Sequence, residues 1–131
     1  MRIRELRWAA YLELMEQAHV TGQLYRRVLD ARFQLTEREP LLARIHELRM
    51  ELREAYASLM RSVRVIALEG PSATSAAAEA VLEAARETNR ALWLTSLEEN
   101  DARARFDEAN SGFTRWLERF VETARAAMEA P

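Results

Sequence analysis

The chain has no cysteine, which excludes disulfides, thiol nucleophiles and thiolate metal sites together. A chain without disulfides fits a reducing compartment, so we expect a cytoplasmic location. No stretch approaches the roughly 20 apolar residues that a membrane-spanning helix requires. The first residues, Met1–Glu5, run directly into a charged helical pattern and do not resemble a signal peptide. The sequence therefore predicts a cytoplasmic protein with no membrane span.

Glycine and proline are scarce, and lysine is absent. Three glycines and three prolines among 131 residues leave room for few breaks in regular structure. All 19 basic residues are arginine, which we attribute to the codon usage of a GC-rich genome. The net charge is -2, and no segment has the basic excess that non-specific nucleic-acid binding requires. Hydrophobic residues make up 49% of the chain, which is typical of a folded domain rather than a disordered one.

Apolar residues recur at helical spacing through four long segments, and they predict helices over residues 3–33, 37–68, 73–97 and 101–128. The second segment carries an unbroken 3.5-residue repeat, which is typical of left-handed, coiled-coil-like packing. The members of this repeat are Leu41, Ile45, Leu48, Leu52, Ala55, Leu59, Ser62 and Ile66. Because the loops are short, neighbouring helices are expected to run antiparallel. The fold expected for residues 1–131 is a single all-α, up-down helical bundle, either closed within one chain or completed by dimerisation.

The turns between these helices carry recognisable capping residues. Thr36, followed three residues later by Glu39, fits a capping box at the start of the second helix. Gly70-Pro71-Ser72 is the strongest break, with Ser72 as the expected cap of the third helix. Asp101 is the expected cap of the fourth helix. Asn110-Ser111-Gly112 is a weak point, at which the fourth helix is expected to bend or break.

Two of the predicted helices have more apolar surface than one core requires. Helix 3–33 has a second apolar row beside the first, and the last third of helix 73–97 is apolar nearly all round. A helix that faces one core needs an apolar arc of only about 100°. Tryptophan outside a core is a typical interface anchor. We therefore expect an interaction surface formed by Trp8, Leu12, Met15, Trp93, Leu94 and Leu97.

Three short segments of the chain resemble a known group of proteins. Residues 7–12 (RWAAYL), 64–71 (RVIALEGP) and 120–125 (FVETAR) resemble segments of short, uncharacterised all-helical proteins of high-GC bacteria. The resemblance implies a helical fold and a bacterial, cytosolic setting. It implies no activity, because none is known for that group.

Catalytic and metal-binding motifs are mostly missing. Glu16 and His19 form one Glu-x-x-His motif, whereas a di-iron carboxylate bundle needs two such motifs and two further glutamates. The second histidine, His46, has Ala43 three residues before it. Acidic pairs at a spacing of three, such as Glu13/Glu16, are expected by chance among 21 acidic residues. No glycine-rich phosphate loop or nucleophile motif is present, so we expect no catalytic residue, metal or cofactor.

The leading hypothesis is a non-catalytic helical protein–protein interaction module, a small oligomeric adaptor or regulator that binds a second copy or another helical protein. One alternative is a nucleic-acid-associated regulator that uses the arginines of the first 38 residues. These are Arg2, Arg4, Arg7, Arg26, Arg27, Arg32 and Arg38. The other alternative is a metal-binding four-helix protein that uses Glu16 and His19.

Overall fold

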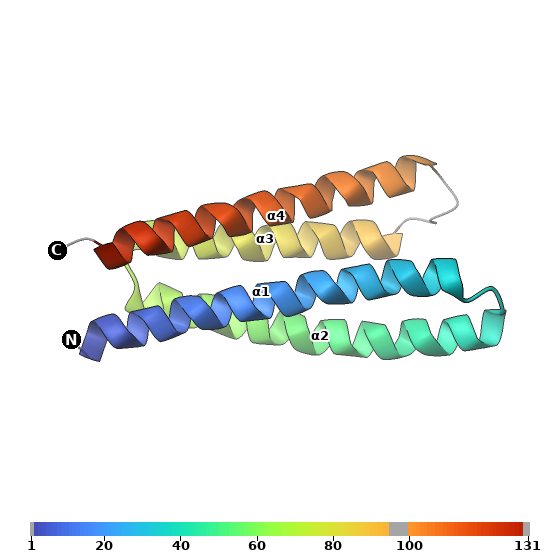
Figure 1. Ribbon diagram of the computed structural model, residues 1–131, viewed down its shortest axis with the longest axis horizontal. Helices are drawn as coiled ribbons and strands as arrows, with labels where there is room; N and C mark the ends of the chain where they lie inside the picture. Colours follow the sequence, from blue (N-terminus) through green and yellow to red (C-terminus); the bar gives the residue numbers. More distant parts are fainter. Residues whose placement is uncertain (1, 95–99, 130–131) are drawn as a thin grey trace.

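Four helices form an up-down antiparallel bundle in the computed structural model, which describes residues 2–94 and 100–129 (Figure 1). The helices are α1 (Arg2–Gln34), α2 (Arg38–Glu69), α3 (Ser72–Leu94) and α4 (Asn100–Glu129). α1 packs along α2 and α3 along α4, so the molecule consists of two helical hairpins stacked on each other (Figure 1). The predicted all-α bundle is confirmed. No helix in the described part of the chain has the length and apolarity needed to cross a membrane.

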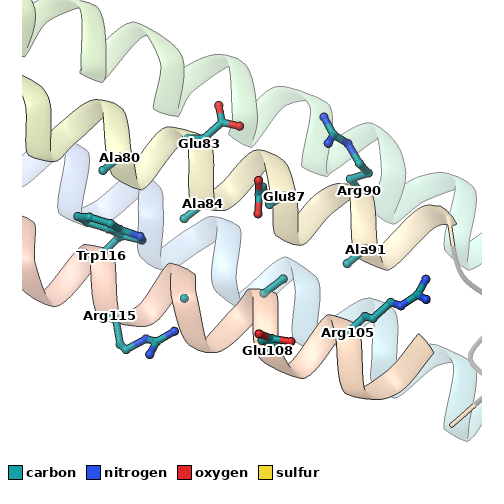
Figure 2. A pocket seen from close by; sticks show the side chains of 12 residues that line it. Ala80, Glu83, Ala84, Glu87, Arg90, Ala91, Arg105, Glu108, Arg115 and Trp116 are labelled. Atoms are coloured by element: carbon teal, nitrogen blue, oxygen red, sulfur yellow. The ribbon is translucent and has the colours of Figure 1, made fainter. Parts of the chain in front are cut away.

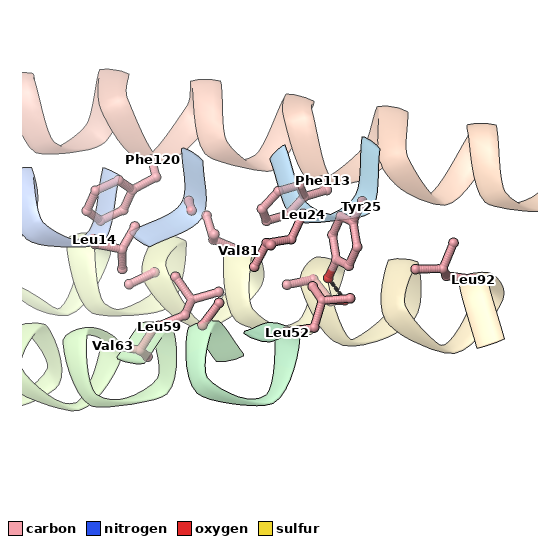
Figure 3. Packing of buried hydrophobic residues seen from close by; sticks show 14 of the residues in the cluster. Leu14, Leu24, Tyr25, Leu52, Leu59, Val63, Val81, Leu92, Phe113 and Phe120 are labelled. Carbon is pink, nitrogen blue, oxygen red and sulfur yellow. Dashed lines mark hydrogen bonds between the residues drawn. The ribbon is translucent and has the colours of Figure 1, made fainter. Parts of the chain in front are cut away.

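The 3.5-residue repeat of α2 faces the core, as its spacing predicts. Its last six members are buried and its first two, Leu41 and Ile45, are half-buried. Leu59 and Ile66 are fully enclosed, and Figure 3 shows Leu59 next to Val63 on the inner side of α2. The heptad seam therefore holds the first hairpin together and supplies one wall of the core.

Aromatic side chains join the first hairpin to the second. Tyr11 of α1 packs edge-to-face on Phe120 of α4, with 6.0 Å between the ring centroids. Tyr25 contacts Phe106 and Phe113 in the same manner, at 6.3 and 6.1 Å. Its hydroxyl donates a hydrogen bond of 2.8 Å to the carbonyl of Ala85 on α3 (Figure 3). These contacts fix α1 and α4 antiparallel to each other and in register.

The predicted capping box at the start of α2 is wrong. The N-cap is Glu37, not Thr36, and it makes no side-chain capping hydrogen bond. Proline at position 40 explains the shift, because a helix capped by Thr36 would need the missing N–H of Pro40 for its first backbone bond. That bond instead runs from the amide of Leu41 to the carbonyl of Glu37.

The turn between the hairpins differs from its predicted form in one detail. Ser72 is the first residue of α3 and not its cap, because the amides of Thr74 and Ser75 both donate to the carbonyl of Pro71. Gly70 ends α2 and donates its amide to the carbonyl of Ile66. A Cβ on Gly70 would lie 2.9 Å from that carbonyl oxygen, so the turn has no room for a side chain there.

The other helix limits agree with the sequence to within one residue, apart from the end of α3. There the predicted residues 95–97 lie outside the described residues. α4 continues without a break through Asn110-Ser111-Gly112. α4 begins at Asn100, so Asp101, the residue expected to cap this helix, is its second residue and not its cap.

Candidate functional site

The start of α1 has exposed apolar side chains on several sides. Ten large hydrophobic side chains are exposed among the described residues, and four of them lie within the first three turns of α1. We call Ile3, Leu6, Trp8 and Leu12 the apolar start of α1. Trp8 is 43% exposed and Leu12 46%, so the predicted second apolar row of this helix does lie outside the core. Met15, the next member of that row, packs against the core.

The apolar start of α1 surrounds the helix and does not form one flat patch. Successive residues in an α-helix are separated by about 100°, so Leu6 and Trp8 point to nearly opposite sides. Val65 and Leu68, at the end of α2, add two further exposed apolar side chains at the same end of the hairpin. Arg7 links the two helices there, because its Nε donates to the carbonyl of Glu69 at 2.8 Å.

A long groove follows the outer seam between α3 and α4 (Figure 2). Its floor is made of small residues, including Ala84, Ala109 and Gly112, and its volume is about 690 Å³. Charged side chains line both walls, and the three glutamates balance the three arginines. Trp116 lies at one end and is 38% exposed. The balanced walls favour no ligand charge.

Trp93 lies in a different environment from the one expected. It is half-buried on α3, and its indole Nε1 donates a 2.9 Å hydrogen bond to Oδ1 of Asn89. The guanidinium carbons of Arg49 and Arg32 lie 4.9 and 5.5 Å from its ring centroid. The indole therefore has two cations and an amide beside it. The residue also packs against the core and lines a pocket between α1, α2 and α3.

The remaining predicted members of this surface cannot be placed beside Trp93. Leu94 ends α3, but its side chain is not among those described, and Leu97 lies outside the described residues. An apolar face formed by Trp93, Leu94 and Leu97 therefore stays a prediction.

The residues of the metal-binding alternative lie on the surface. Glu16 and His19 are both exposed on α1, and His46 is exposed on α2. In residues 2–94 and 100–129, no group of three or more histidine, aspartate or glutamate side chains is placed to hold a metal ion. The geometry therefore adds nothing to the sequence motif.

The arginines of the nucleic-acid alternative lie in two separate groups. Arg2, Arg4 and Arg7 lie at the start of α1, whereas Arg26 begins a second group 19 residues later on the same helix. At 1.5 Å per residue the two groups are roughly 30 Å apart, so they form no continuous basic stripe along one face.

No protein-family model, curated protein or solved structure matches this chain. The resemblance of residues 7–12, 64–71 and 120–125 to helical proteins of high-GC bacteria therefore stays a prediction.

Proposed function

We propose that the protein is a non-catalytic helical interaction module whose apolar start of α1 inserts into an apolar groove, rimmed by acidic side chains, on a partner protein. One observation carries this proposal: Ile3, Leu6, Trp8 and Leu12 are 43% to 63% exposed on successive turns of one helix. Scattered exposed leucines are normal in soluble proteins, but several at one helix end are typical of binding surfaces.

Exposure on opposite sides of α1 favours a partner that surrounds the helix. A flat partner surface would cover either Trp8 or Leu6, whereas a groove covers both, as in other complexes in which an amphipathic helix lies in an apolar groove. Burying one large apolar side chain contributes about 1.5–3 kcal/mol. Tryptophan is also enriched among the residues that dominate binding energy. We therefore expect Trp8 to be the largest single contributor.

Charge at the same end favours an acidic partner over a second copy of the chain. Arg2 and Arg4 are exposed and Arg7 is half-buried, while Glu5 is the one acidic residue among positions 2–12. Two copies meeting through this surface would bring like charges together. Arg4 also donates to the carbonyl of Met128, and with the Arg7 bond to Glu69 this holds the start of α1 in place before binding.

The test has two stages. A photoreactive amino acid placed at position 8 in the native host should crosslink one protein, and the same group at Leu42, an exposed apolar position near the start of α2, should not. The purified partner is then titrated with the wild type, with the Trp8→Ala/Leu12→Ala double variant and with Leu42→Ala. We expect the double variant to bind at least about 30-fold more weakly, and Leu42→Ala within about twofold of the wild type.

Two results would contradict the proposal. The first is a partner that binds the wild type and the double variant equally. The second is crosslinking only to another copy of the chain, with matching dimerisation in sedimentation experiments, because the occupant would then be the protein itself.

A further inference from the structure

A small pocket lies where α1, α2 and α3 meet, separate from the apolar start of α1. Its volume is about 230 Å³. α2 contributes Arg49, Arg53 and Tyr56 to its wall, and α3 contributes Asn89 and Trp93. No aspartate or glutamate is among the residues that line it. The pocket therefore contains positive charge without a carboxylate to balance it.

The two arginines of the pocket lack the acidic neighbours that other arginines of this chain have. Arg44, Arg86 and Arg103 each pair with an acid three or four residues away on their own helix. No ion pair in the described part of the chain includes Arg49 or Arg53. The positions three and four residues from these two are occupied by Ile45, His46, Met50, Leu52, Tyr56 and Ala57, and by each other. Like charges four residues apart destabilise a helix slightly, so this pair has a cost that a bound anion would remove.

Several uncharged donors are available beside these arginines. The Oδ1 atom of Asn89 accepts from Trp93, which leaves its Nδ2 amide group to donate elsewhere. The Tyr56 hydroxyl oxygen accepts a 3.0 Å hydrogen bond from Nε of Arg86, so its own proton is free to be donated. That hydrogen bond raises the pKa of Arg86. Two guanidiniums, an amide and a phenol therefore contribute hydrogen-bond donors to the lining of this pocket.

Trp93 holds the nearby cations in position. The guanidinium of Arg49 lies over the indole ring, and a cation in that arrangement presents its N–H groups sideways. Arg32 lies over the same ring and donates one N–H to the carbonyl of Leu92 at 3.3 Å. Burial lowers the pKa of Arg32 from the ordinary arginine value, so this cation lies partly out of water, whereas Arg49 is exposed. Preorganised guanidiniums bind carboxylate and phosphate groups strongly, because two parallel hydrogen bonds form at once.

The rest of the lining suits the body of a small ring. Tyr25, Leu52 and Trp93 supply apolar surface next to the donors. A cavity of about 150 Å³ is known to accept benzene, so a pocket of this volume accepts one ring with one charged group. This volume is below the roughly 300–1,000 Å³ of pockets that enclose drug-sized ligands, so we expect a ligand of about one ring.

We propose that this pocket binds a small organic oxyanion, a carboxylate or a phosphate monoester carried on a single planar ring. Arg49 and Arg53 bind the oxyanion, Asn89 and Tyr56 donate further hydrogen bonds, and the ring lies against Leu52 and Tyr25. The site is independent of the interaction proposed for α1, because it shares no residue with the apolar start.

The test is a set of titrations followed by NMR at the indole N–H of Trp93 and the side-chain amide of Asn89. The probes are benzoate and phenyl phosphate, which distinguish a carboxylate from a phosphate ligand. The controls are benzamide, the neutral analogue of benzoate, and inorganic phosphate, an anion without a ring. We expect one of the two aromatic anions to shift both signals with a dissociation constant below about 1 mM. Benzamide and inorganic phosphate should each bind at least about tenfold more weakly.

Variants locate the site on the molecule. Arg49→Gln and Arg53→Gln should each weaken binding about tenfold or more, because each removes a charge-assisted pair of hydrogen bonds. The matched control is Arg64→Gln, an exposed arginine on the same helix outside the pocket, which should bind within about twofold of the wild type. Far-UV circular dichroism checks that each variant folds. If either pocket variant does not fold, the comparison of benzoate with benzamide on the wild type decides.

Three outcomes would overturn the proposal. They are no shift with either aromatic anion up to about 10 mM, equal binding of benzoate and benzamide, and equal losses in Arg64→Gln and the pocket variants.

Discussion

The two hairpins contribute to one core but differ in what they leave exposed. Nine of the ten exposed large hydrophobic side chains of the described residues belong to α1 and α2, and one, Trp116, belongs to the second hairpin. The second hairpin instead lines its outer seam with alanine and glycine. Both hairpins are amphipathic and bury an apolar face in the core. Folding alone therefore does not require one hairpin to expose more large apolar side chains than the other. Among the described residues, most of the exposed apolar surface therefore lies on the first hairpin, which favours it as the partner-binding half.

The largest expected difference in stability is between two substitutions, one of an aromatic residue in the second hairpin and one in the first. Phe120 is fully buried against Tyr11, so Phe120→Ala should lower the free energy of unfolding by about 3–5 kcal/mol. Trp8→Ala removes a larger ring, but one that is 43% exposed, and should cost less than about 1 kcal/mol. Urea unfolding followed by circular dichroism measures both. Similar losses would mean that Trp8 belongs to the core.

The next largest difference in stability is expected between two glycine substitutions, one in the turn between the hairpins and one in the middle of α4. Gly70→Ala should destabilise the protein by about 1–3 kcal/mol, because its Cβ would lie 2.9 Å from the Ile66 carbonyl oxygen. Gly112→Ala should stabilise it by about 0.5–1 kcal/mol, because the nearest atom is 4.0 Å away, on the flexible side chain of Arg115, and alanine favours the helix. Thermal unfolding of the two variants should therefore shift in opposite directions. If both melting temperatures shifted in the same direction, the space described around one of the two glycines would be wrong.

The smallest difference in stability is expected between substitutions of two buried tyrosines in the first hairpin. Tyr25→Phe removes the hydrogen bond to Ala85 and should cost about 1 kcal/mol. The Tyr11 hydroxyl is buried without a hydrogen-bond partner among the described residues, so Tyr11→Phe should leave stability unchanged or raise it. Urea unfolding near neutral pH measures the difference. A loss in Tyr11→Phe equal to that in Tyr25→Phe would show that the Tyr11 hydroxyl has a partner.

Alkaline pH extends the same comparison. Burial, with a smaller contribution from Tyr56, raises the pKa of Tyr25 above its ordinary value. The folded protein therefore favours the neutral phenol, whereas in the unfolded chain the phenol ionises near pH 10. The contribution of Tyr25 is complete below about pH 10 and is lost as the pH rises further. Urea unfolding at about pH 8 and about pH 11 should show a smaller advantage of wild type over Tyr25→Phe at the higher pH.

The periodicity of α2 was sufficient to predict its buried face. Positions spaced by three and four residues lie on one side of a helix whatever its neighbours are, so Leu48 to Ile66 could be assigned to the core from the sequence. Residues of the second row of α1, such as Trp8 and Leu12, were assigned to the outside by the same geometry. Local spacing was informative for these two helix faces, because each face depends on the geometry of a single helix.

The start of α2 shows why the capping prediction failed. Thr36 and Glu39 match the capping-box residues, but the pattern ignores that Pro40 has no N–H for the first helical bond. The observed start at Arg38 satisfies that restriction and gives up the side-chain cap. The start of α2 could therefore have been predicted from the sequence by counting which backbone N–H groups are available for the first helical hydrogen bond.

The pocket beside Trp93 depends on how separate helices align. A signal for it exists in α2, where Arg49 and Arg53 have no acid three or four residues away. Nothing in the sequence shows that Asn89 and Trp93 lie opposite that pair, because the register between α2 and α3 is set by packing along their whole length. The sequence therefore indicated Trp93 as an interaction residue but gave no sign of the two arginines beside its ring.

Pro71 has a consequence for how two chains can associate. Only Gly70 and Pro71 separate α2 from α3, and straightening this link would merge the two helices into one long rod. Such a rod would allow two molecules to exchange their second hairpins. In that form the ring of Pro71 would clash with the carbonyl of Ala67, at a cost of about 3 kcal/mol or more. One proline thus disfavours domain swapping through a continuous α2–α3 helix.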